Sequence, residues 1–83
     1  MTRARGEPSR SLLNREYPHQ VLLLAETVAG KTLDRVIAFH TELGLPVRCR
    51  SVFKNDTWHA LYYFADEVDA VAFRATFGGE RIK

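Results

Sequence analysis

The stretch WHALYYFADEVDAVAFRATFGG, residues 58–79, predicts a strand that runs directly into a helix. Residues 58–64 are rich in aromatic side chains, which favour strands. The acidic run at 66–69 places carboxylates at the positive end of a helix dipole, with Asp66 as the N-cap. Paired glycines at 78–79 are typical of a helix end. These acids and glycines are therefore explained by helix capping and termination, without a catalytic role.

A β-hairpin is predicted over residues 47–64, with its turn at Asn55 and Asp56. A two-residue turn places Phe53 opposite Trp58. We expect one face of the hairpin to belong to the core, and this face carries Val47, Cys49, Ser51, Phe53, Trp58, Ala60, Tyr62 and Phe64. The other face mixes basic, aromatic and aliphatic side chains, namely Arg48, Arg50, Val52, Lys54, Thr57, His59, Leu61 and Tyr63.

The N-terminal half of the domain is predicted to contain one strand and one helix. The strand covers residues 19–26, and its run VLLL at 21–24 is typical of a central strand that is covered on both faces. The helix covers residues 32–43, with Thr32 as its N-cap. The sequence GLP at 44–46 combines a glycine for a left-handed cap with a following proline, and it predicts the end of this helix.

The predicted element order is β-α-β-β-α, and residues 80–83 are compatible with a short last strand. This is the order of the ferredoxin-like split βαβ arrangement, an α+β fold in which an antiparallel sheet carries two helices on one face. Without a full last strand, the first strand would keep an unprotected edge, and the second sheet face would stay open. Both features favour a partner chain, so we expect self-association as a homodimer.

Residues 64–79 also resemble the C-terminal segment of some small bacterial proteins of uncharacterised function. The resemblance covers about a fifth of the chain. The matching positions are those of a helix cap, core side chains and a helix stop. The resemblance therefore implies no activity and assigns no functional residue.

The 83-residue chain is expected to form one domain, residues 17–83, preceded by a flexible basic arm, residues 1–16. The arm holds the whole net charge of +2, because the rest has eight basic and eight acidic side chains. The basic balance is thus weak evidence for nucleic acid binding. The single cysteine excludes an internal disulfide and fits a cytoplasmic location. The longest apolar run, residues 21–25, is too short to cross a membrane.

Residues 25–32, AETVAGKT, match a relaxed P-loop pattern between a strand and a helix. In a true P-loop, backbone N–H groups hold the phosphates, and the lysine, here Lys31, reaches them. In this chain the first glycine is absent, and Glu26 would bring negative charge to the phosphates. A hairpin also follows the helix, where a P-loop fold needs a parallel sheet. We therefore interpret the segment as a loop before a helix, and we expect no cofactor.

The remaining reactive side chains are few and have structural explanations. His40 lies in the apolar stripe of the first helix, where a buried histidine is usually bonded to a carbonyl or hydroxyl group. His19 and His59 have no partner at metal-ligand spacing, so no metal site is expected. Cys49 lies on the expected core face and is interpreted as a small buried residue.

The second hairpin face is the candidate binding surface, with Arg48, Arg50, His59, Leu61 and Tyr63 as its residues. Its aliphatic content favours a dimer interface and hence a non-catalytic, homo-oligomeric interaction module. One alternative is a nucleic-acid-binding module, in which arginines contact phosphates and rings stack on bases. A further alternative is an enzyme with its site between subunits and His40 or His59 as the base. No residue is assigned a catalytic role.

Overall fold

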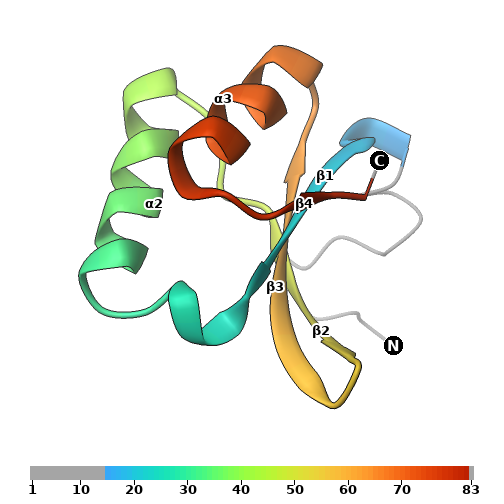
Figure 1. Cartoon of the computed structure of the whole chain (residues 1–83). Coiled ribbons are helices and arrows are strands. Elements are labelled where there is room, and N and C mark those ends of the chain that lie inside the picture. Colours follow the sequence, from blue (N-terminus) through green and yellow to red (C-terminus); the bar gives the residue numbers. More distant parts are fainter. Residues whose placement is uncertain (1–14, 83) are drawn as a thin grey trace, which may run out of the picture.

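The structure is a computed structural model that describes residues 15–82 (Figure 1). Its strands are β1 (His19–Leu24), β2 (Cys49–Lys54), β3 (Thr57–Phe64) and β4 (Glu80–Arg81), and its helices are α2 (Lys31–Leu43) and α3 (Glu67–Phe77). A short 3-10 helix, Ala25–Thr27, follows β1. The predicted arm, residues 1–16, lies outside the described residues except for its last two positions.

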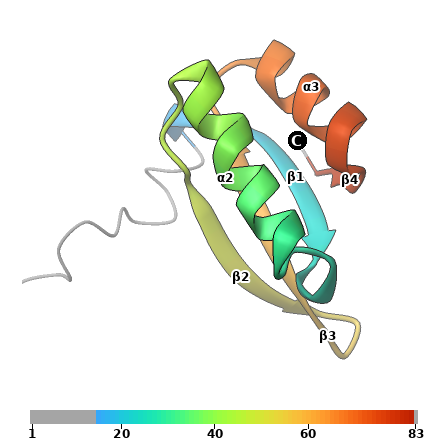
Figure 2. The same cartoon turned by 90° about the vertical axis from the view of Figure 1, so that its left-hand side faces the viewer.

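The four strands form one antiparallel sheet in the order β2-β3-β1-β4. Figures 1 and 2 show that α2 and α3 lie side by side against the same face of this sheet. The structure therefore confirms the predicted α+β class with an antiparallel sheet and two helices on one face. It also contains a short last strand, β4, with which the sequence of residues 80–83 was compatible.

The β2–β3 hairpin has the predicted two-residue turn and register. Lys54 lies opposite Thr57, and Phe53 lies opposite Trp58. Asn55 and Asp56 both adopt positive φ angles, 53° and 60°. Two consecutive left-handed residues are what a type I′ turn requires, and Asn and Asp accept this conformation more readily than other non-glycine residues.

Strand β1 is central, as its apolar run predicts, but its outer edge is not left open along its whole length. β4 pairs with it, so that Val21 lies opposite Arg81 and Leu22 opposite Glu80. The expectation of an unprotected first strand is therefore wrong over this part of β1. Gly79 makes the approach of β4 feasible, because it has a φ of 102° and a Cβ at its position would lie 2.8 Å from the Leu22 carbonyl oxygen.

Both boundaries of the N-terminal elements differ slightly from the prediction. β1 ends at Leu24 because the chain turns there, and the Thr27 hydroxyl donates to the Leu24 carbonyl oxygen over 2.7 Å. α2 begins at Lys31 with Gly30 in the N-cap position, so the assignment of Thr32 as N-cap is wrong. Gly30 has a φ of 58°, a conformation that glycine adopts without steric cost, and this starts the helix earlier.

The helix ends lie where the sequence predicts them. Gly44 is the C-cap of α2 in a left-handed conformation, with its N–H donating to carbonyl groups of the last turn. Asp66 is the N-cap residue of α3, although its side chain makes no capping hydrogen bond, and Gly78 is the C-cap. The acids of the first turn of α3 therefore act through the helix dipole rather than through a capping bond.

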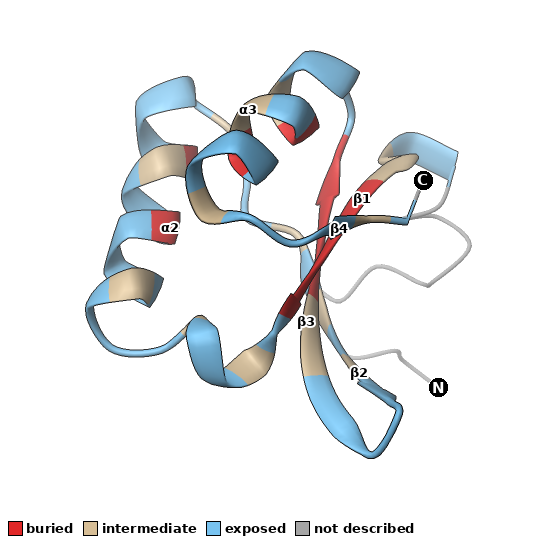
Figure 3. Ribbon diagram, viewed as in Figure 1, coloured by how far each residue is buried: buried red, intermediate tan, exposed pale blue. Residues whose placement is uncertain are grey.

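The main core lies between the sheet and the two helices (Figure 3). Its buried members are Val21, Leu23, Val36, Tyr62, Phe64, Ala70 and Phe73. Phe39 connects the helices, since its ring contacts Phe73 at 5.4 Å and Phe77 at 5.8 Å between centroids. Within residues 15–82, neither helix combines the length and the apolar character that a membrane crossing requires.

Candidate functional site

The predicted binding face is only partly accessible. Leu61 and Tyr63 are buried, together with Leu22, in a second apolar cluster on the sheet face away from the helices. Tyr17 and Val52 pack against this cluster. The expectation that Leu61 and Tyr63 are exposed for binding is therefore wrong, because apolar side chains from three strands and from the segment before β1 shield one another.

The three polar members of the predicted face lie around this cluster. Arg48, Arg50 and His59 are each partly buried. The Arg48 guanidinium lies over the Tyr17 ring, 5.8 Å from its centroid, which is a cation–π distance. The Nδ1 atom of His59 lies 3.0 Å from the Thr57 carbonyl oxygen. These contacts hold two of the three polar side chains against the protein itself.

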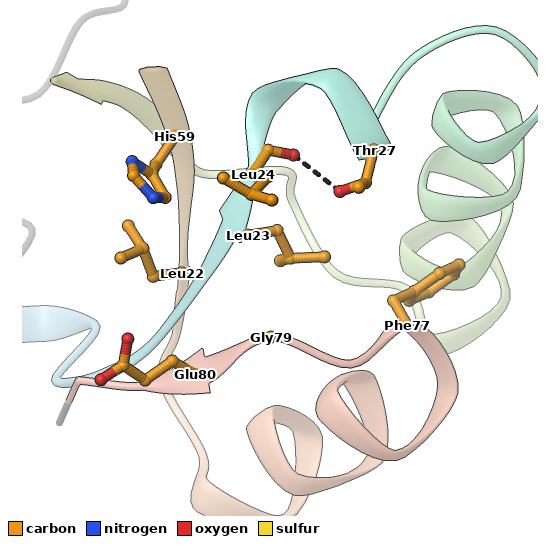
Figure 4. Close-up of a pocket in the computed structure, with 8 residues that line it drawn as sticks. All are labelled: Leu22, Leu23, Leu24, Thr27, His59, Phe77, Gly79 and Glu80. Carbon is orange, nitrogen blue, oxygen red and sulfur yellow. Dashed lines mark hydrogen bonds between the residues drawn. The ribbon is translucent and has the colours of Figure 1, made fainter. Parts of the chain in front are cut away.

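An open hollow of about 330 Å³ lies beside the outer edge of β1, where β4 is too short to cover it (Figure 4). Its lining residues are Leu22, Leu23, Leu24, Thr27, His59, Phe77, Gly79 and Glu80. His59 belongs to β3 and Glu80 to β4, and β1 separates these strands. Two inter-strand spacings, about 9–10 Å, thus lie between their backbones. The hollow is open and mostly apolar, and among the described residues no hydrogen bond or ion pair joins His59 to Glu80.

His40 is buried in the main core and not in a hollow. Its side chain is 1% exposed, and its Nδ1 atom lies 2.8 Å from the Val36 carbonyl oxygen one turn earlier. Its ring stacks on Phe64 with centroids 5.5 Å apart and planes at 16°. Among the residues that the structure describes, its Nε2 atom has no hydrogen-bond partner. His40 therefore fills space between aromatic rings, which agrees with the structural explanation based on the sequence.

Cys49 is exposed, so its assignment to the buried core is wrong. The reason is that β2 is an edge strand, and the helices do not cover it. Partial burial of the sulfur raises the pKa of the Cys49 thiol, and a hydrogen bond with Tyr62 offsets part of this effect. A raised pKa leaves little reactive thiolate near neutral pH, which does not fit a nucleophile.

The P-loop-like segment does not form a phosphate cradle. Its first residues make the 3-10 helix Ala25–Thr27, and the Thr27 hydroxyl is bonded to the Leu24 carbonyl oxygen. The sheet beside it is antiparallel throughout. No group of three or more His, Cys, Asp or Glu side chains within residues 15–82 could hold a metal ion.

The hairpin end carries an exposed aromatic pair, Phe53 and Trp58, which the sequence pattern had predicted to be part of the core. The side chain of Phe53 is 57% exposed and that of Trp58 is 56% exposed, and their ring centroids are 5.1 Å apart. Figures 1 and 2 show that the hairpin extends beyond the helices, so its last residues lie on the helix-bearing face with no helix above them. Their nearness to the turn was the signal that could have identified them.

The same side of the domain also exposes apolar residues of neighbouring segments. Ile37 lies about 160° around α2 from Phe39, at 100° per residue. Phe39 points to α3, so Ile37 lies on the flank of α2 that faces away from α3. Val47, just before β2, is exposed as well. We refer to these exposed apolar residues as the hairpin surface: the adjacent pair Phe53 and Trp58 near the turn, Val47 at the opposite end of β2, and Ile37 on α2.

Comparisons of this chain with protein-family models, curated proteins and solved structures give no match. Three features of the described residues are therefore the candidates for a function: the hairpin surface, the edge strand β2, and the second apolar cluster with its polar rim.

Proposed function

We propose that this chain is a non-catalytic interaction module that self-associates as a homodimer through its hairpin surface. The observation that carries the proposal is the exposed pair Phe53 on β2 and Trp58 on β3, since β2 is an edge strand with one side unpaired within residues 15–82. Exposed aromatic side chains next to an open strand edge are costly in an isolated domain and favour association. The proposal keeps the cytoplasmic location expected from the single cysteine.

Chain size supports this proposal. A chain of 83 residues buries only about 60–65% of the surface that it exposes when unfolded, so its core is marginal. Burial of the hairpin surface against a second copy would add apolar contacts that the domain itself does not provide. Tryptophan and phenylalanine are also among the side chains that contribute most to interfaces when they become buried.

The alternative of nucleic acid binding has weaker support than it had from the sequence. Leu61 and Tyr63 of the predicted binding surface are buried, so the Tyr63 ring is not available for base stacking. The Arg48 guanidinium is placed over Tyr17 and not toward an open surface groove. The enzyme alternative is weakened by the burial of His40 among aromatic rings and by the carbonyl partner of His59.

The test is the mass of the chain in solution. We expect light scattering to give about twice the chain mass of 9.5 kDa at micromolar concentration. The double variant Phe53→Ser, Trp58→Ser should raise the dissociation constant of the dimer at least about tenfold, because it removes two aromatic anchors. A matched control is Val68→Ser, which removes an apolar side chain that is 71% exposed on α3, away from the hairpin.

The outcomes separate the functions. A chain that stays monomeric at all accessible concentrations contradicts the proposal. Equal effects of the hairpin variant and of Val68→Ser place the contact elsewhere. Binding to a single-stranded oligonucleotide that weakens steeply with salt, and that Arg50→Gln reduces, would instead support the nucleic acid alternative.

A further inference from the structure

We infer that two copies of this chain join edge to edge through β2, antiparallel, with Ser51 of one copy opposite Ser51 of the other. This inference rests on the proposed homodimer and adds to it the pairing register. The sheet has two edges, β2 with six residues and β4 with two, so β2 is the longer free edge. The partner that fits it is therefore a strand, and the chemistry of β2 indicates which one.

The free hydrogen-bonding groups of β2 follow from its pairing with β3. In an antiparallel pair, alternate residues direct both N–H and C=O toward the neighbouring strand. The Tyr63 N–H donates to the Arg48 carbonyl oxygen over 2.9 Å, and a two-residue turn likewise directs Lys54 toward β3. Residues 48, 50, 52 and 54 thus point inward. The backbone groups of Cys49, Ser51 and Phe53 then point away from β3, toward the free edge.

Two-fold symmetry leaves few registers for a pair of identical strands. Residues that lie directly opposite each other in a sheet direct their side chains to the same face. An axis midway between two residues would place side chains of opposite faces across from each other. The two-fold axis must therefore lie where a residue is opposite its own copy. The two registers that overlap most of β2 centre on Ser51 or on Val52. The first places Arg50 opposite Val52 of the second copy. The register centred on Val52 places Arg50 of each copy opposite Lys54 of the other, so this pair occurs twice. Like charges directly opposite each other are destabilising.

The register centred on Ser51 also brings Lys54 opposite Arg48 of the second copy, but at the margin of the contact. Arg48 precedes β2, and its guanidinium lies over the Tyr17 ring, which directs its charge away from the seam. The charge pattern of the strand therefore favours Ser51 at the centre.

This register also accounts for the hairpin surface. A two-fold axis perpendicular to the sheet keeps the helices of both copies on one face of a continuous sheet of eight strands. Phe53 then lies opposite Cys49 of the second copy, next to its Val47 on the same face. The exposed Phe53 of each copy would thus contact the exposed, small and apolar start of the other copy's β2, and Trp58 would lie behind Phe53, one strand further from the seam.

The experiment is disulfide trapping in the full chain. In a Cys49→Ser background, the variant Ser51→Cys should form a covalent dimer under mild oxidation, because hydrogen-bonded opposite residues have Cα atoms about 5.5 Å apart, within the range of a disulfide. The matched variant Val52→Cys, also in the Cys49→Ser background, should stay largely unlinked. Its two copies would lie on a diagonal, about 7–8 Å apart. We expect at least about tenfold more linked dimer for Ser51→Cys.

A second variant tests the same register with a disulfide between two different residues, away from the two-fold axis. Phe53→Cys, with Cys49 retained and the protein concentration raised to offset the lost aromatic anchor, should link residue 53 of one copy to Cys49 of the other, while the unchanged chain with Cys49 alone should not link. A covalent dimer from Val52→Cys and not from Ser51→Cys would overturn the register. A dimeric mass without linkage in any variant would exclude the β2 edge while leaving the proposed homodimer intact. A strictly monomeric mass for the unchanged chain would reject both.

Discussion

Phe53 and Trp58 lie opposite each other across the β2–β3 hairpin, with ring centroids 5.1 Å apart and planes inclined at 59°. The pair belongs to the helix-bearing face of the sheet, yet each side chain is more than half exposed. The two rings therefore contact each other, and each remains largely exposed to solvent. This relationship makes the hairpin end the most accessible aromatic surface among the described residues, and the following predictions begin there.

Trp58 is the only tryptophan of the chain, so its fluorescence reports on the hairpin end alone. We expect its emission to shift to shorter wavelength as protein concentration rises, because association removes the indole ring from water. Ser51→Pro, which removes the outward N–H group at the centre of the proposed edge contact without touching the ring, should move this transition to higher concentration. An emission wavelength that is independent of concentration, measured alongside a dimeric mass, would contradict the placement of Trp58 in the interface.

The turn residues Asn55 and Asp56 both have positive φ angles, and this predicts a stability gain from glycine. Asp56→Gly should raise the free energy of unfolding by about 0.5 kcal/mol, because relief of the left-handed conformation exceeds the added entropy of the unfolded chain. Asp56→Val should lower it by about 1–2 kcal/mol. Urea unfolding of both variants checks this. Equal stability of the glycine and valine variants would mean that the turn does not hold the positive φ angle.

His40 is predicted to contribute by volume and not by its polar atoms. His40→Ala should lower the free energy of unfolding by about 2–5 kcal/mol, because it leaves a cavity among Phe64, Phe73 and Tyr62. His40→Leu should cost less than about 1.5 kcal/mol, since it keeps most of the volume and removes the unpartnered Nε2 atom.

The control for this pair is the exposed neighbour Thr41. Thr41→Ala should change the free energy of unfolding by no more than about 0.5 kcal/mol. If His40→Leu were as destabilising as His40→Ala in urea unfolding, the imidazole would have a polar role that its surroundings do not reveal.

The raised pKa of the Tyr62 hydroxyl leads us to expect a loss of stability at alkaline pH. Burial, with a contribution from Cys49, raises the pKa of the Tyr62 hydroxyl to about 12 from its ordinary value of 10.0. Below pH 10 both folded and unfolded chains keep this proton. Between about pH 10 and 12 the unfolded chain loses it first, so the free energy of unfolding falls as pH rises through this window.

Tyr62→Phe provides the comparison, since phenylalanine keeps the ring and cannot ionise. Stability measured by urea unfolding at several pH values from 9 to 12 should decline less steeply in this variant than in the unchanged chain. Parallel declines would show that other groups, and not Tyr62, cause the alkaline loss.

The sequence predicted the elements and their pairing well because each depends on local chemistry. The turn at Asn55 and Asp56 determines the hairpin register, and Gly44 and Gly78 end the helices within a residue of the expected positions. Burial was predicted less well because it depends on where the helices lie. Alternation assigned Phe53, Trp58 and Cys49 to the correct face, but this face has no cover near the hairpin end.

The burial of the candidate site was also not predictable from the sequence. Leu61 and Tyr63 alternate with the core residues, so the sequence placed them on the face away from the helices. Their burial there depends on side chains that meet from separate segments, Tyr17, Leu22 and Val52, and no spacing within a single strand reveals such a meeting.

The two-residue length of β4 has a consequence for the size of any assembly. In the proposed dimer, pairing of β2 with β2 uses both β2 edges and leaves at each outer end the two-residue β4 and the part of β1 that β4 does not cover. A two-residue edge offers too few backbone groups to recruit another chain. Growth of the proposed assembly would therefore stop at two copies, as a closed isologous pair, whereas a long strand in the place of β4 would permit head-to-tail addition and open-ended fibres.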